Sequence, residues 1–272
     1  MTAIPDPPPA GREARFAPGF GPRFIITVDT EEEFDWSKPL AREGHGMDHI
    51  PKLASFQQFC EGVGVAPIYL MDWPIATSSL AADILKPAFL TGKAEVGIQL
   101  HPWVNPPFDE DVSEKNSFAG NLPAELEAAK FRNLQETIED RFGVSPLIYR
   151  AGRYGVGPNT ADLLTNSGLA IDSSVRAKFD YSAAGGPDYR RHPLAPYWLN
   201  EDRTLLELPL TTVFWGMLRR QGDWIYPALW RTPKLRGLLS KLSLLERIPL
   251  TPEGVSVDEA IRGVDMALDG GL

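Results

Sequence analysis

The chain has 272 residues, enough for one large domain or two small ones, and its 43% hydrophobic content is typical of a soluble globular protein. A net charge of −9 argues against nucleic acid as a partner. The single cysteine, Cys60, excludes an intramolecular disulfide, and no uninterrupted apolar run approaches the length of a membrane span.

The N-terminal 22 residues contain six prolines and no apolar segment of the secretory-signal type. We predict a flexible, proline-rich arm over residues 1–22 and a barrel domain over residues 23–272. With neither a signal nor a span in view, the sequence predicts a cytoplasmic protein.

The run Phe24–Val28 is apolar or β-branched throughout, which favours a central strand buried on both faces. Directly after it, five carboxylates occur within the seven residues 29–35. Clustered acid at the rim of a sheet is unfavourable unless a cation neutralises it. The stretch therefore predicts either a divalent-metal site or a solvated acidic loop.

The rest of the chain alternates between strand and helix patterns. Apolar spacing, caps and glycine stops predict helices over residues 50–63, 80–90, 123–142, 159–166 and 256–268, and strands over 66–70, 95–100, 147–149, 169–171 and 205–208. An aromatic and basic segment over 213–249 is typical of a helical insertion. The alternation indicates a parallel sheet or β/α barrel with helices outside.

Polar side chains follow most of the predicted strands: Asp29, Asp72, His101, Arg150 and Asp172. A β/α barrel builds its active site from the loops at the carboxyl ends of its strands. We therefore expect these side chains to share one rim.

A capping box from Ser256 to Glu259 opens the last predicted helix. Apolar residues recur along one side of this helix and are expected to pack on the outside of the barrel: Val257, Ile261, Val264 and Leu268. Because no further strand is predicted, we expect a barrel without its last strand and an unpaired strand position beside the first or sixth strand.

Three motifs resemble those of the polysaccharide deacetylases of the NodB-homology type. They are TVDTE at 27–31, EVGIQLHPW at 95–103 and YRAGRYG at 149–155, in the family order and each at a predicted strand end. The opening VDTEEEFDW is similar to that of a cytoplasmic-type branch. The resemblance implies an irregular β/α barrel and metal-dependent hydrolysis of an acetamide or acetyl ester on a sugar, or of related non-peptide carbon–nitrogen bonds.

By this resemblance Asp29 matches the catalytic base, and Arg150 matches the arginine that pairs with it. Thr30 stands where the family has a metal-binding aspartate, so Glu31 is the predicted replacement, with Asp29 and His101 as the other ligands. The predicted cofactor is a divalent metal, zinc in first place, which would activate water and polarise the carbonyl.

The remaining predicted contacts are with substrate, an acetylated saccharide. The candidate substrate-binding residues follow strands or belong to the third motif: Trp36, Asp72, Trp103, Arg153, Tyr154 and Asp172. Aromatic faces stack well on sugar rings. Tyr154 could also supply a backbone donor to the oxyanion.

Two departures from the family pattern leave other functions open. Gln99 occupies the place of a histidine in the second motif, and an amide oxygen is a poor zinc ligand beside imidazole. A general-acid histidine on a last strand has no counterpart, and His192, in a proline-rich loop, is a weak substitute. One alternative is an impaired homologue that binds a glycan or nucleotide-sugar; another is a non-enzymatic scaffold that uses segment 215–236.

Overall fold

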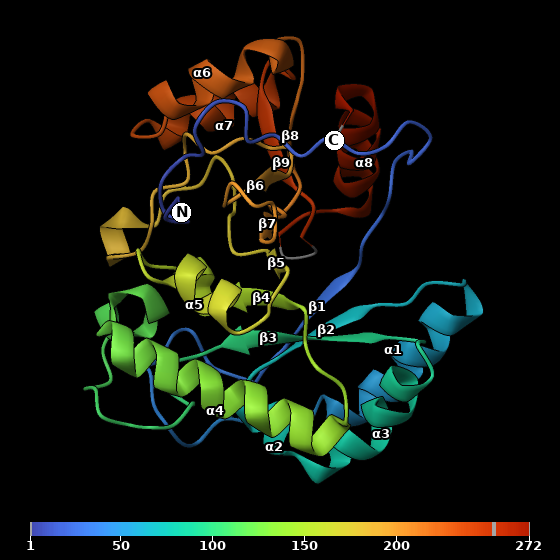
Figure 1. The fold of residues 1–272 in the computed structure, drawn as a ribbon. Helices are drawn as coiled ribbons and strands as arrows, with labels where there is room; N and C mark the ends of the chain where they lie inside the picture. The colour runs from blue at the N-terminus through green and yellow to red at the C-terminus, as the bar shows by residue number, and fades with distance from the viewer. Residues whose placement is uncertain (1, 252–253, 272) are drawn as a thin grey trace.

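A curved, mostly parallel sheet forms the centre of the molecule (Figure 1). The computed structural model describes residues 2–251 and 254–271, so Met1 and Leu272, the outermost residues of the predicted arm and barrel, lie outside it. The seven strands lie in the order β1 (Thr27–Thr30), β2 (Ile68–Met71), β3 (Glu95–Leu100), β4 (Ile148–Ala151), β5 (Ile171–Asp172), β7 (Leu206–Glu207) and β6 (Tyr197–Trp198). Each neighbouring pair is parallel except β6 and β7.

Contacts between distant strands show how strongly the sheet curves. In a flat sheet β1 and β4 would lie about 14 Å apart, at about 4.8 Å per strand. Yet Arg150 of β4 donates from Nη2 to the Thr27 Oγ1 of β1 at 3.0 Å, and its Nη1 pairs with Asp29. The sheet is therefore an irregular α/β barrel in which the carboxyl ends of β1 and β4 meet.

Four of the helices between the strands match the predicted ones with ends displaced by at most one residue, whereas the short helix α2 (Trp73–Thr77) was not predicted. The four are α1 (Ile50–Gly62), α3 (Ser79–Leu90), α4 (Ala124–Phe142) and α5 (Thr160–Asn166), with single 3-10 turns η1 (Lys115–Ser117), η2 (Ala119–Asn121), η3 (Gly152–Tyr154), η4 (Ser182–Ala184) and η5 (Arg219–Gln221). Helix α4 buries Phe131, Leu134 and Ile138 and ends at Gly143, whose φ of 74° suits glycine. None of the helices in the described ranges combines the length and apolar character needed to cross a bilayer.

Strand β1 corrects the prediction of a central strand over Phe24–Val28. It begins only at Thr27 and lies at the edge of the sheet, where it pairs with β2 alone among the described residues. Phe24 and Ile25 are exposed instead of buried. An apolar run alone does not distinguish an edge from a centre, because pairing depends on segments far along the chain.

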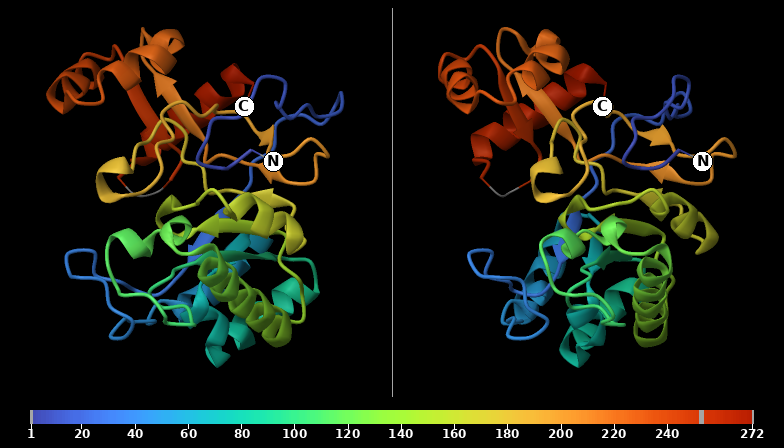
Figure 2. Two further views of the ribbon diagram at one scale, coloured as in Figure 1. Left: turned by 60° about the vertical axis from the view of Figure 1, so that its left-hand side comes forward. Right: turned by 90° about the vertical axis from the view of Figure 1, so that its left-hand side faces the viewer.

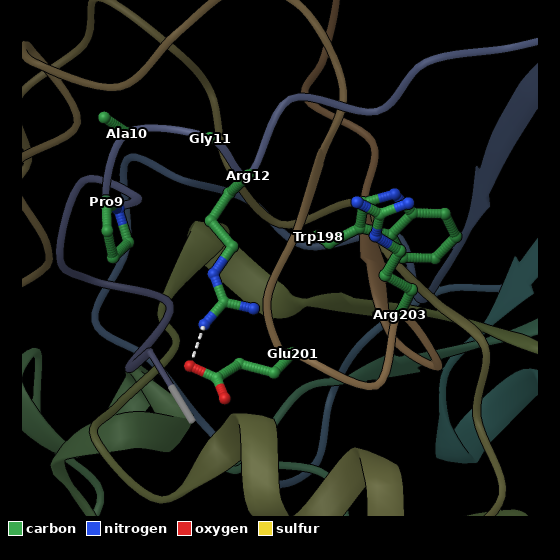
Figure 3. A pocket seen from close by; sticks show the side chains of 7 residues that line it. All are labelled: Pro9, Ala10, Gly11, Arg12, Trp198, Glu201 and Arg203. Atoms are coloured by element: carbon green, nitrogen blue, oxygen red, sulfur yellow. Dashed lines mark hydrogen bonds and ion pairs between the residues drawn. The ribbon is translucent and has the colours of Figure 1, made fainter.

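The N-terminal segment, predicted as a flexible arm, is held against β6. The Trp198 N–H donates to the Arg12 carbonyl at 2.8 Å, and Ile4 is fully buried. Arg12 also forms an ion pair with Glu201 at 3.1 Å across the shallow hollow seen in Figure 3. The proline-rich segment therefore extends the β6 edge, which the sequence did not indicate.

Residues 212–251 and 254–270 form a separate lobe above the sheet (Figure 2). Its centre is an antiparallel pair, β8 (Thr212–Trp215) and β9 (Glu246–Pro249), connected through α6 (Gly222–Ala228) and α7 (Pro233–Lys241). The predicted insertion over 213–249 thus has helices in its middle, but its two ends are strands. Short strands that pair over thirty residues apart leave little local signal.

Helix α8 (Val257–Gly270) packs on β8 and β9, and its orientation is opposite to the prediction. The Ser256–Glu259 capping box is present, but Val257, Ile261 and Leu268 are exposed. The buried side consists of Gly263 and Ala267, small residues that allow close approach to the strands. The side of α8 that carries most of its large apolar residues is therefore not the side that packs on the strands.

This orientation predicts unequal effects of two substitutions in α8. A Cβ at position 263 would lie 2.5 Å from the Leu250 Cδ2, so Gly263→Val should lower the free energy of unfolding by about 1–3 kcal/mol through overpacking. Ile261→Ala should change it by less than about 0.5 kcal/mol because the side chain is exposed. Urea unfolding measures both, and a large loss of stability in Ile261→Ala would show that the apolar side of α8 is packed.

Candidate functional site at the carboxyl ends of β1, β3 and β4

Three strands bring polar side chains to one rim. Alternation along β1 and the residue that follows it places Asp29 and Glu31 on one face, and β3 does the same for Gln99 and His101. The register pairs Gln99 with Arg150 of β4. The predicted carboxylates, histidine and arginine therefore converge, as expected for loops at the carboxyl ends of parallel strands.

Arg150 holds Asp29 in place, as predicted from the sequence. Its Nη1 contacts the Asp29 Oδ1, its Nε donates to the Ser173 carbonyl at 3.0 Å, and its Nη2 donates to the hydroxyls of Thr27 and Ser173. The guanidinium is almost fully buried, whereas the Asp29 side chain is 35% exposed. A buried, fixed cation thus orients a carboxylate that substrate and water can reach.

The imidazole of His101 lies between two carboxylates. Its Nδ1 is 2.9 Å from the Glu32 Oε2 on the buried side, and its Nε2 is 3.3 Å from the Glu31 Oε2 on the open side. Gln99 donates from Nε2 to the same Glu31 oxygen at 2.8 Å. One carboxylate therefore orients the ring, while the other lies at the solvent-facing nitrogen.

Glu32 is the centre of a buried network that the sequence did not predict. It accepts from the Trp103 indole at 2.8 Å, and its own backbone N–H donates to Asp72 at 2.8 Å. Asp72 also accepts from the Ile75 N–H as the N-cap of α2. We therefore reassign Asp72 and Trp103 from substrate contact to support of His101, because both are buried and hydrogen-bonded internally.

Burial and neighbouring charges shift the pKa values of the three titratable groups in this network. Burial raises the pKa of Asp72 well above its usual range, and the hydrogen bond and charge of Glu32 act in the same direction. Burial also acts to raise the pKa of Glu32, but the charge of His101 and hydrogen bonds from Asp72 and His101 prevail and lower it to about 2. For His101 burial acts to lower the pKa, yet Glu32 and Glu31 raise it well above 6.5. The network thus carries a neutral acid, a carboxylate and an imidazolium.

Two positions around His101 offer ligands for a metal. Glu32, Asp72 and the histidine have ligand atoms within 4.8 Å of one another, but the carboxylate oxygens there already accept hydrogen bonds and all three residues are buried. The Nε2 side fits better. Glu31 lies 3.3 Å away, the buried Gln99 Oε1 has no hydrogen-bond partner among the described residues, and the histidine's Nδ1 faces a carboxylate, as metal-binding histidines commonly do.

The loop after β4 approaches the site in a strained conformation. Arg153 and Tyr154 have φ of 55° and 60°, a left-handed region that costs roughly 1–2 kcal/mol per non-glycine residue. A Cβ on Gly152 would lie 2.3 Å from the His101 Cδ2, so only glycine fits there. Backbone strain of this kind is typical of functional loops.

Burial raises the pKa of Tyr154 in this loop to about 12, and the nearby charge of Asp29 adds to this effect.

Of the two other predicted substrate contacts in this region, Trp36 is exposed and Arg153 is half-buried beside it. Trp36 is 58% exposed, and its ring lies 5.9 Å from the Arg153 Cζ. Arg153 also covers Phe118 at 4.4 Å and donates to the Ser117 hydroxyl at 2.5 Å. Both side chains belong to loops after β1 and β4, on the same side as Asp29. They remain candidates for binding a saccharide.

Asp172, the last predicted substrate contact, is instead buried beside Glu207. The two residues are register partners on β5 and β7, and Glu207 is hydrogen-bonded to Asp172. Burial raises the pKa of Glu207 well above its usual range, and the charge of Asp172 acts in the same direction. Two fully buried carboxyl groups in contact share one proton. We reassign Asp172 to this acid pair.

Comparison with known proteins finds distant likenesses in structure only. No protein-family model matches the sequence, and no curated protein matches it. A protein assigned as a polysaccharide deacetylase from Mycobacterium smegmatis aligns with a TM-score of 0.40 at 18% identity, over 60% of this chain and 45% of that one. A cobalt-bound family 4 acetyl xylan esterase from Clostridium thermocellum gives 0.36 at 13%, over 58% and 60%.

The Puue allantoinase aligns with a TM-score of 0.40 at 14% identity, over 69% of this chain and 60% of that one. The alignments with these three proteins span less than two thirds of their lengths. Such distant likenesses assign neither a family nor a function. The fold and the site by themselves define an α/β protein with a curved, mostly parallel sheet and a carboxylate–histidine–arginine site at the strand ends.

Gln99 provides a test of where a metal binds. Gln99→His would place a second imidazole beside His101, next to the Glu31 oxygen that Gln99 now contacts. Because imidazole is the stronger zinc ligand, affinity for zinc should rise about tenfold or more. Titration calorimetry on both forms measures it, with His49→Gln in the exposed loop as the control. Equal affinities would mean that the ion does not bind on the Nε2 side.

The Asp172–Glu207 pair predicts a loss of stability as the pH rises. Native Glu207 keeps its proton while the unfolded chain releases it above its ordinary pKa of 4.5, so stability falls from about pH 5 towards the raised native pKa. Glu207→Gln should remove this slope, which is at most about 1.4 kcal/mol per pH unit for one proton. Urea unfolding across the pH range measures it, with exposed Glu125→Gln as control. Parallel profiles for wild type and E207Q would contradict the shared proton.

Proposed function

We propose that the chain is a metal-dependent hydrolase that removes acetyl from an N- or O-acetylated saccharide. The proposal rests on one observation: the Asp29–Arg150 pair and the His101–Glu31 contact lie at the same rim. Asp29 is fixed by Arg150 and open to solvent, and the His101 Nε2 faces Glu31 at 3.3 Å. These residues all belong to the three motifs that resemble those of polysaccharide deacetylases, and the motifs follow one another in the family order.

Asp29 takes the role of general base. A carboxylate at the rim can accept a proton from an attacking water, and the Arg150 guanidinium contacts the Asp29 carboxylate directly. The hydrogen bonds of Arg150 to Thr27 and Ser173 hold the guanidinium in place. The base is therefore oriented before substrate binds.

His101 and Glu31 would hold the divalent ion. Asp29, the third predicted ligand, does not join them in a group of ligand atoms within 4.8 Å among the described residues, so its proposed role is that of base. Zinc is our first choice for a set of imidazole and carboxylate donors. When bound, the ion would lower the pKa of water and polarise the acetyl carbonyl. Glu32 orients the imidazole through Nδ1, and Gln99 orients Glu31.

The acetylated sugar would bind over the loops after β1 and β4. The exposed ring of Trp36 offers an apolar face, and Arg153 beside it offers hydrogen-bond donors. Tyr154 lies close to Asp29 and is predicted to contact the acetyl group or its oxyanion. Each of these residues belongs to a loop on the same side of the sheet.

A second candidate function is binding without hydrolysis. The observation that favours it is Gln99, whose amide donates to Glu31 and occupies a carboxylate oxygen that a metal would need. In that case the site would bind a glycan or nucleotide-sugar without chemistry. Metal content of the purified protein separates the two functions, because only the hydrolase requires a bound divalent ion.

The proposed base predicts a selective loss of activity. Asp29→Asn keeps the shape of the side chain but cannot accept the proton, so kcat for deacetylation should fall by about 10²–10⁴-fold. Release of acetate from acetylated chitooligosaccharides and acetylated xylan measures it. Asp35→Asn, an exposed acid of the same loop, should retain activity. Full turnover by the Asp29 variant would contradict the assignment.

A further inference from the structure

Outside the site described above, three arginines alternate with aromatic rings in what we call the arginine ladder: Arg176, Arg247 and Arg236 with Phe179, Tyr226 and Trp230. We propose that this ladder binds a phosphate group carried by the saccharide substrate. The proposal deepens the proposed function and rests on it, because it specifies which acetylated saccharide the site accepts.

The ladder is continuous from the barrel to the lobe. Arg176 and Arg247 both cover Phe179, with their Cζ atoms 4.0 and 3.4 Å from the ring centroid. Arg247 and Arg236 both cover Tyr226 and Trp230, at 4.9 to 5.5 Å. Because they contact the same rings, the three guanidinium groups lie close to one another. Stacking on aromatic faces fixes each group with its N–H edge available to the oxygens of an anion.

No carboxylate neutralises the ladder within the described ranges. Arg247 donates to the Lys178 carbonyl at 2.6 Å, and Arg176 and Arg236 donate only to hydroxyls, at 3.3 to 3.4 Å. Among the described residues, the Nε of each of the three is buried without a hydrogen-bond partner. Asp223, the nearby acid, is paired with Lys178 at 2.9 Å. In the part of the chain that the structure describes, these three half-buried cations therefore have no counterion.

Their mutual repulsion is visible at Arg247. Burial lowers the pKa of its guanidinium to about 10, and the charges of Arg176 and Arg236 act in the same direction. A pKa of about 10 still leaves the Arg247 guanidinium protonated at neutral pH. An anion among them would relieve this repulsion and satisfy donors that now have only neutral acceptors.

The ladder reaches the proposed catalytic loop. The Arg176 Cζ lies 5.4 Å from the ring of Tyr154, and Tyr154 is close enough to Asp29 for that charge to raise its pKa. A sugar with its acetyl group at Asp29 could therefore extend a charged substituent towards Arg176. Phosphate fits better than carboxylate, because it offers three strong acceptor oxygens and up to two charges to several guanidinium forks.

Titration calorimetry of the full chain with three probes tests the assignment: N-acetylglucosamine 1-phosphate, N-acetylglucosamine and glucuronic acid. The phosphorylated sugar should bind at least about tenfold more tightly than the neutral one, as one charged hydrogen bond predicts. The preference should weaken as sodium chloride is added. Arg247→Gln and Arg176→Gln should each reduce it about tenfold. Arg231→Gln, an exposed arginine outside the ladder, should leave it unchanged.

Equal affinity for the phosphorylated and neutral sugars, or an undiminished preference in both variants, would overturn the proposal and leave the ladder as a structural stack. Tighter binding of glucuronic acid would overturn the phosphate assignment. Should Arg247→Gln fail to fold, Arg236→Gln near the outer end of the ladder provides the same comparison. The binding result is independent of turnover. Unaltered hydrolysis by Asp29→Asn would refute the proposed function, while the calorimetry would still report on the ladder.

Discussion

The geometry of the rim depends on the contacts that the Arg150 side chain makes. This side chain extends from β4 to hydrogen-bond Thr27 and pair with Asp29 on β1, and it binds Ser173 after β5. These contacts hold together strands that are not sheet neighbours. A nearly buried guanidinium would be costly without them, and their removal would leave an uncompensated charge. Arg150 therefore connects β1, β4 and the residue after β5, and it orients the proposed base.

The sequence predicted elements whose signals are local. Strand β3 lies where it was expected, and α4 ends at a glycine as predicted. The short strands β6, β8 and β9 were missed because they owe their existence to partners far along the chain. The packed face of α8 was assigned wrongly, since Gly263 and Ala267 carry no hydrophobic signal although their small size lets the helix approach β8.

Within the site, prediction succeeded for residues on strands and failed for the buried layer beneath them. The Asp29–Arg150 pair is confirmed, because both residues sit at strand ends that must converge. Glu31 was predicted as a ligand, and alternation from Asp29 places it beside the Nε2 of His101. Glu32, on the opposite face, was missed because nothing in the sequence marks its partners Asp72 and Trp103. Nothing near position 207 marked Glu207 as a partner of Asp172, since their pairing is a matter of register between β5 and β7.

The acidic segment after β1 is more fully compensated than its sequence indicates. Asp29 pairs with Arg150, Glu33 with His49, and Asp35 with Lys38.

Glu31 and Glu32 share a single cation, the imidazolium of His101. Because Glu32 is buried and Glu31 is one-third exposed, the open nitrogen of the ring is where charge remains least balanced. A proton and a divalent ion compete for that nitrogen, since a histidine must lose its proton to become a ligand. Repulsion between clustered carboxylates thus favours a cation at one atom, the His101 Nε2, and not along the whole segment.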